Sequence, residues 1–118
     1  IATLDLVQRE YMGNAAGVGR HFMARLGELA RDYPCIGEVR GKGLMIGMEL
    51  VKDDDARSPA VALCDTLITR AYHNGLLLLS CGVSTVRFMP PLCATEADID
   101  DAMARIRASL TEALHEAA

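Results

Sequence analysis

The sequence predicts a small α+β domain of order α-β-β-α-β-β-α, in which a largely antiparallel sheet carries helices on one face. Two observations predict it. Long amphipathic segments begin and end the chain, a third lies in the middle, and two pairs of short strand-like segments separate them. The connections within each pair are too short for a parallel crossover, so each pair should form an antiparallel hairpin. The other face of the sheet should be less well covered by this chain.

The first helix is predicted by apolar residues at steps of three and four from Leu4 to Tyr33, and it should end before Pro34. Gly13 and Gly17 weaken it, so a kink or break near Gly13 is expected. The sequence begins without an initiator Met and already in helical register. This favours an origin in a longer protein.

The first hairpin is predicted from Ile36–Arg40 and Leu44–Val51, joined by a tight connection at Gly41-Lys42-Gly43. Side chains of a strand alternate between its two faces. The second strand therefore has a core set, which is Leu44, Ile46, Met48 and Leu50, and an outer set, which is Met45, Gly47, Glu49 and Val51. Gly47 should leave room for a neighbour on the outer face.

The middle helix should follow a charged surface loop at Lys52–Arg57, with Ser58 as N-cap and Pro59 at the first helical position. Asn74-Gly75 should end it in the left-handed manner. One side of this helix is formed by Leu63, Leu67 and Ala71, with Cys64, Ile68 and Tyr72 beside them.

The second hairpin is predicted from Leu76–Ser80 and Thr85–Met89, and Pro90-Pro91 forbids further pairing after it. Thr95 and Asp98 have the spacing of a capping box. They should begin the last helix, whose apolar face is Ile99, Met103, Ile106, Leu110 and Leu114.

Composition fits one globular domain of 118 residues with a net charge of −4, from 12 basic and 16 acidic residues. This mild acidity gives no reason to expect nucleic acid or an anionic membrane as partner. The strictly apolar runs, such as Leu76–Leu79, are far too short to span a bilayer. The four cysteines lack C-x-x-C spacing, so thiols in a reducing cytosol are favoured over disulfides.

Arg87 is a single cation within an otherwise apolar strand, and alternation sets it opposite Val86 and Phe88. A planar guanidinium fixed on a strand is suited to binding a carboxylate through two parallel hydrogen bonds. Two other interpretations remain open from the residues alone. Arg87 could be a solvated edge residue, or it could pair with Glu49 across the sheet.

Other chemistry-bearing residues give weaker patterns. The glycines around Lys42 lack the spacing of a phosphate-binding loop, and neither Lys42 nor Lys52 has the apolar setting of a Schiff-base lysine. The three histidines lie far apart on helices without a visible partner, and Cys81 has no identifiable base. No catalytic, cofactor-binding or metal-binding residue is therefore predicted in this chain.

Two motifs resemble those of class-III aminotransferases. Val39–Leu50 (VRGKGLMIGMEL) is similar to the hairpin that opens their small domain, and Leu78–Leu92 (LLSCGVSTVRFMPPL) is similar to its later strands. The likeness extends over essentially the whole chain. The Ser80-Cys81-Gly82 bend resembles the 4-aminobutyrate aminotransferase branch most, although the segment from Gly82 to Arg87 is shorter than in that branch.

The resemblance implies the C-terminal small domain of the aspartate-aminotransferase fold (fold type I). Residues 1–33 would form a linking helix region and residues 34–118 an α/β sandwich. It implies a cytoplasmic, homodimeric transaminase that moves an amino group from an ω-amino acid, such as 4-aminobutyrate, to a 2-oxo acid. Pyridoxal 5′-phosphate (PLP) would be bound by a large domain absent from this sequence. Arg87 would bind the substrate carboxylate, and this chain alone would be inactive.

A rival interpretation from another class is a stand-alone α+β binding or regulatory module that uses the open sheet face. The sequence just upstream of Ile1 would separate the two. A large α/β domain with a lysine at a strand end would favour the enzyme, and a start codon would favour the module.

Overall fold

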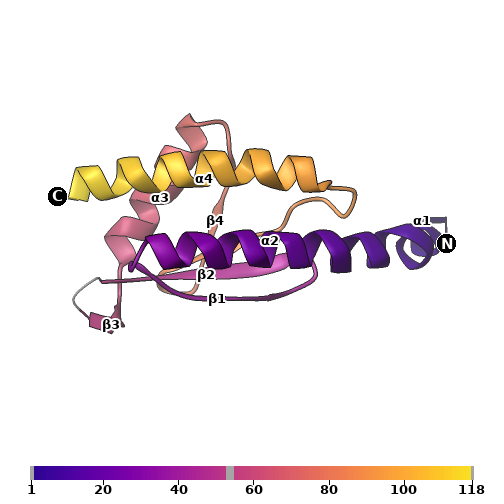
Figure 1. Cartoon of the computed structure of the whole chain (residues 1–118), viewed down its shortest axis with the longest axis horizontal. Helices are drawn as coiled ribbons and strands as arrows, with labels where there is room; N and C mark the ends of the chain where they lie inside the picture. Colours follow the sequence, from indigo (N-terminus) through magenta and orange to yellow (C-terminus); the bar gives the residue numbers. More distant parts are fainter. Residues whose placement is uncertain (1, 53–54, 118) are drawn as a thin grey trace.

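Within residues 2–52 and 55–117, which this computed structural model describes, three helical segments lie over one face of an antiparallel sheet (Figure 1). The predicted fold class is therefore confirmed. The helical elements are α1 (Ala2–Leu6), the π-helical η1 (Val7–Tyr11), α2 (Met12–Asp32), α3 (Val61–His73) and α4 (Glu96–Ala117). The strands are β1 (Ile36–Lys42), β2 (Met45–Lys52), β3 (Asp55–Pro59), β4 (Leu79–Cys81) and β5 (Thr85–Phe88). Figure 1 shows α2 and α4 running side by side in the same direction.

The sheet has the order β1-β2-β5-β4, and every pairing in it is antiparallel. The two predicted hairpins are the β1–β2 and β4–β5 pairs. The short β3 is an addition, which pairs with the end of β2 and places Pro59 opposite Val51. It forms there because the pairing of β5 with β2 stops at Glu49, which leaves the last residues of β2 with an unpaired edge.

The prediction of a surface loop at Lys52–Arg57 is therefore wrong in its second half, while Asp53 and Asp54 lie outside the described residues. The predicted cap of α3 is also wrong. Because Ser58 and Pro59 belong to β3, the helix begins two residues later, with Ala60 as N-cap and no side-chain cap. Its end is as predicted, since Asn74 is the C-cap and Gly75 has a φ of +84°.

The core lies between the sheet and the helices. The predicted core set of β2 is buried, and so is the predicted face of α4 except Leu114, which is half-buried. Phe22 of α2 packs against Phe88 of β5, with ring centroids 5.2 Å apart. On α3, Cys64, Leu67 and Ala71 are buried, but Tyr72 is exposed. The burial of Phe88 against α2 fixes which face of β5 is turned towards the helices.

Val51 departs from the predicted outer set because it is buried, at 4% exposure. The register of β1 shifts between Ile36 and Glu38, so the chain near Gly37 lies against the Val51 side chain. A Cβ at Gly37 would lie 2.8 Å from Val51 Cγ1. The outer face of β2 is therefore open only as far as Glu49.

The turn between β1 and β2 is Gly43-Leu44 rather than Gly41-Lys42-Gly43, because Lys42 still pairs with Met45. Gly43 has a φ of +57°, a conformation that glycine adopts without strain. Helix α2 approaches this turn closely at another glycine. A Cβ on Gly19 would lie 2.2 Å from the Gly43 carbonyl oxygen, so this contact requires glycine.

The first helix is irregular where expected, because η1 ends two residues before Gly13. Neither α1 nor η1 buries a residue within the described part of the chain, and Val18 is the first buried residue of α2. In the first half of the predicted apolar stripe, Leu4 is therefore exposed, and Val7, Tyr11 and Ala15 are only half-buried.

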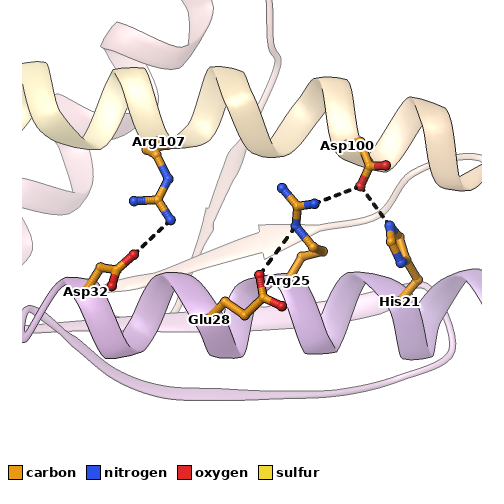
Figure 2. Close-up of polar contacts among 6 residues, drawn as sticks. All are labelled: His21, Arg25, Glu28, Asp32, Asp100 and Arg107. Atoms are coloured by element: carbon orange, nitrogen blue, oxygen red, sulfur yellow. Dashed lines mark hydrogen bonds and ion pairs between the residues drawn. The ribbon is translucent and has the colours of Figure 1, made fainter.

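Polar and charged side chains lie between α2 and α4 along a line that we call the helix seam, comprising His21, Arg25, Glu28, Asp32, Asp100 and Arg107 (Figure 2). Asp100 Oδ1 lies 2.8 Å from His21 Nε2 and 3.3 Å from Arg25 Nη1. Arg107 Nη2 donates to Asp32 Oδ2 at 3.0 Å, and this hydrogen bond raises the pKa of Arg107 above its ordinary value. His21 therefore has a partner, which the sequence did not reveal because Asp100 lies 79 positions away.

The capping box of α4 is formed as predicted. The Thr95 N–H donates to Asp98 Oδ2 at 2.9 Å, and the Asp98 N–H donates to Thr95 Oγ1 at 3.2 Å. Across the described residues, no helix combines the length and the apolarity that a membrane span requires.

Candidate anion-binding site

Strand β5 places Arg87 on the sheet face that the helices leave open. Val86 and Phe88 point into the core, at 0% and 4% exposure, while Arg87 between them is half-buried on the other side. The predicted alternation is therefore correct at Arg87. The strand ends at Phe88, and Pro90-Pro91 follows, so this position is fixed by the paired backbone on both sides of β5.

Arg40, Gly47 and Arg87 form one row across β1, β2 and β5. Gly47 is the pairing partner of Arg40 on one side and of Arg87 on the other. Neighbouring strands lie about 4.8 Å apart, so the two arginine backbones are separated by about 10 Å. No side chain stands between them. A Cβ at Gly47 would already lie 3.1 Å from Thr85 Cγ2, so a larger residue would crowd this position.

An open hollow of about 590 Å³ lies over this row. The cations Arg40, Lys42 and Arg87 line it together with Met45, Cys81 and Thr85. Among its lining residues in the described chain, none is acidic. The hollow is therefore suited to a small anion.

The two arginines differ in their partners. Arg40 Nη1 lies 3.3 Å from Glu38 Oε2 and 3.7 Å from Glu49 Oε2. Arg87 makes no hydrogen bond or ion pair with any residue that the structure describes, and its buried Nε lacks a partner. The alternative in which Arg87 pairs with Glu49 is therefore not formed here, because Glu49 is paired with Arg40.

The chemistry of Arg87 follows from this geometry. A buried N–H without a hydrogen bond is costly, by about 1–3 kcal/mol and more where the group is charged. A carboxylate can accept two parallel N–H groups of one guanidinium, which satisfies the arginine and fixes the orientation of the ligand. Arg87 is thus equipped to hold a carboxylate in the hollow.

A second hollow, of about 510 Å³, lies between α4 and the segment that precedes β4. Its lining is apolar apart from Asp98, whose carboxylate already accepts the N–H of Thr95. It offers no cation to a carboxylate ligand. The hollow at Arg87 is therefore the better candidate site.

PLP requires a lysine in an apolar setting and a group of donors for its phosphate. Lys42 and Lys52 are both exposed, at the ends of β1 and β2. The residues present therefore do not fit this cofactor by themselves, and no chemical step through PLP can be assigned to them.

The remaining candidates do not join the site as a catalytic group. All four cysteines are thiols; Cys35 and Cys64 are buried, and Cys81 and Cys93 are exposed. Burial, and then the charge of Asp65, raises the pKa of the Cys64 thiol. Cys81 lines the hollow without a histidine beside it. In the described chain, no three His, Cys, Asp or Glu side chains gather as a metal site would need.

Sequence reasoning placed Arg40 at the end of the first strand, but it did not predict that Arg40 pairs with Glu49 on this face. The pattern that could have revealed this pairing is the two-residue spacing of Glu38 and Arg40 on one strand and of Gly47 and Glu49 on the next, which places all four on one face of the sheet. Opposite charges at such spacing meet diagonally once the strands are paired. The register that brings them together is set by the position of the turn.

Comparisons with known proteins support the reading of the motifs. The family model described as aminotransferase class-III matches residues 1–110. The alanine/serine racemase of Pyrococcus horikoshii is 36% identical over 116 residues, which is 96% of this chain and 24% of that protein. The 5-aminovalerate aminotransferase of Pseudomonas aeruginosa is 33% identical over 107 residues, which is 88% of this chain and 25% of that protein.

A solved structure agrees with the fold. The PLP-bound amine transaminase from an uncultivated Pseudomonas species superposes with a TM-score of 0.85 at 34% identity, over 95% of this chain and 26% of that one. The chain spans about a quarter of the length of the curated relatives it matches. Its fold, its two motifs and its match over residues 1–110 together show that the chain belongs to the class-III aminotransferase family.

Proposed function

We propose that this chain is the C-terminal small domain of a PLP-dependent transaminase and that Arg87 binds the carboxylate of its substrate. The observation that carries the proposal is a half-buried guanidinium without a partner among the described residues, facing a hollow lined by cations. The other arginine on this surface, Arg40, has two carboxylates beside it. A guanidinium held without one is ready for a carboxylate that arrives with a ligand.

The proposed amino donor is an ω-amino acid, with 4-aminobutyrate as the leading candidate and a 2-oxo acid as acceptor. The relative that acts on 5-aminovalerate supports this class, because that substrate carries a terminal amine and a distant carboxylate like 4-aminobutyrate. The Ser80-Cys81-Gly82 bend at the rim of the hollow resembles the same branch. In such a substrate Arg87 would hold the carboxylate and leave the amine free to reach the reacting centre.

The role proposed for this chain is binding and orientation. PLP would supply the chemistry of amino transfer, and it would be held by a large domain outside this sequence. In this scheme residues 1–33 form the linking helix region and residues 34–118 the small α/β sandwich. The complete enzyme is proposed to be a cytoplasmic homodimer, in keeping with its thiol cysteines.

The stand-alone binding module is the second candidate, and one observation favours it. The open face carries exposed apolar side chains as well as cations, since Met45 is 59% exposed and Leu79 is 61% exposed. Such a surface suits a protein partner. In the enzyme, the same surface would be covered by the large domain.

The deciding experiment is an assay of the complete gene product with PLP against 4-aminobutyrate, 5-aminovalerate and L-alanine, each with and without pyruvate or 2-oxoglutarate. Amino transfer from an ω-amino acid that requires the oxo acid is the expected result. Racemisation of L-alanine without any acceptor would contradict the transaminase assignment and favour a racemase. A gene product that begins near Ile1, and so has no lysine-bearing domain before it, would favour the binding module.

A further inference from the structure

Glu49 lies in the same relation to both arginines of the open face. It pairs with Glu38 on β1 and with Thr85 on β5. Arg40 and Arg87 stand two residues beyond those partners, so each is a diagonal neighbour of Glu49. Diagonal neighbours in a sheet are about 7–8 Å apart, which long charged side chains can bridge. Glu49 therefore has two arginines within reach.

In the structure, Glu49 pairs with Arg40. Its Oε2 lies 3.7 Å from Arg40 Nη1, and that same nitrogen is 3.3 Å from Glu38. The Arg40 guanidinium thus pairs with two carboxylates. The Arg87 guanidinium, on the other side of Gly47, pairs with none among the described residues. The third cation of the hollow, Lys42, stands one row further from Glu49, opposite Met45.

We propose that Arg40 is a positioning residue that keeps Glu49 away from Arg87 and so leaves Arg87 open to a carboxylate ligand. This rests on the proposed role of Arg87. Without Arg40, the nearest cation to Glu49 is Arg87, and no side chain at Gly47 blocks the way. Glu49 would then act as an internal competitor for the carboxylate site.

The test follows the Arg87 side chain by ¹⁵N NMR of the complete 118-residue chain, since its Nε–Hε group has no partner in the part of the chain that the structure describes. The signal is assigned by its loss in Arg87→Lys. Arg40→Ala should shift this signal, because Glu49 becomes a partner of Arg87. The double variant Arg40→Ala/Glu49→Ala should return it to the wild-type position, which a merely structural role of Arg40 would not do.

A binding measurement adds a second readout, with acetate as the carboxylate probe and acetamide as its uncharged control. Arg40→Ala should weaken acetate binding about two- to fivefold, the range expected for one exposed ion pair, and the double variant should restore it. Glu38→Ala is the matched control. It removes a carboxylate from Arg40 but leaves the Glu49–Arg40 pair, so the Arg87 signal should stay in place.

The outcomes separate the two proposals. If acetate leaves the Arg87 signal of the wild-type chain unmoved, the carboxylate-binding role of Arg87 is contradicted. The shift between Arg40→Ala and the double variant still decides the role of Arg40 in that case. An unchanged Arg87 signal in Arg40→Ala, or a double variant that behaves like the single one, would overturn the positioning role.

Discussion

The helix seam and the open sheet face both carry charged side chains, but the two regions differ in how these side chains are paired. In the seam, each of the six residues drawn in Figure 2 lies in an ion pair or hydrogen bond with another of them. On the open face, Arg40 has two carboxylates and Arg87 has none among the residues described. Both regions contain arginines, so the presence of arginine does not distinguish them.

The difference teaches how to separate a structural cation from a binding one. Exposed pairs such as Arg25–Asp100 hold two helices together weakly and leave nothing for a ligand. A guanidinium whose Nε is buried without a partner has already lost part of its hydration. It gains most from a ligand that supplies a carboxylate. The lack of a carboxylate partner, rather than the residue type, therefore identifies a binding arginine.

Loss of the unpaired cation should have the largest effect. In the complete enzyme, Arg87→Ala should lower the specificity constant for 4-aminobutyrate by about thirty- to several-thousandfold, because losing a charge-assisted contact in a partly dry site costs about 2–5 kcal/mol. Arg87→Lys should recover part of this, since an ammonium lacks the planar fork. Steady-state kinetics with varied 4-aminobutyrate measures both.

Arg25→Ala is the matched control, because it removes a paired arginine from the seam. It should leave the kinetics unchanged, and both variants should keep nearly the wild-type melting temperature. A clear loss of stability in Arg87→Ala with an intact Michaelis constant would make Arg87 a structural residue. The distinction between Arg87 and the paired arginines of the seam would then be wrong.

The apolar part of the open face should produce a smaller but visible effect. We expect the isolated 118-residue chain to self-associate through the exposed Met45 and Leu79. Met45→Lys/Leu79→Lys should shift it towards monomer in sedimentation velocity over a concentration series. Tyr72→Lys, an exposed position on α3, is the control and should change little. A wild-type chain that stays monomeric throughout the concentration series would argue against self-association through this face.

Breaking the seam should cost a little stability and no function. Asp100→Ala removes the shared partner of His21 and Arg25, and we expect the free energy of unfolding to fall by about 0.5–1 kcal/mol. Urea titration measures the change, and added salt should diminish it because these groups are exposed. An effect on the Michaelis constant comparable to that of Arg87→Ala would contradict the separation of the two regions.

The last prediction is that PLP forms no specific adduct with the isolated chain. Incubating the isolated chain with PLP and then borohydride should give only slow labelling spread over Lys42 and Lys52, since neither is buried. Mass spectrometry of the digested protein measures it. A stoichiometric adduct at one of these lysines would show a cofactor site in this chain.

Much of the fold follows from the sequence, because local chemistry fixes it. The alternation of Leu44 to Leu50 identifies the core face of β2, and the Thr95–Asp98 capping box begins α4, because both depend on residues a few positions apart. Local patterns failed where a distant segment intervened. Val51 is buried by the shifted register near Gly37, and Ser58-Pro59 joins β3 instead of starting a helix.

The sequence by itself determined that Arg87 stands on a strand, opposite Val86 and Phe88, and is free to face away from the core. Only the tertiary structure decided which carboxylate pairs with which arginine. Glu49 is equally near Arg40 and Arg87 in the pairing register, and its choice depends on side-chain positions across three strands. Likewise, His21 and Asp100 meet only because α2 and α4 pack in parallel. Ion pairs between distant segments form after the backbone has placed them, so no local pattern encodes them.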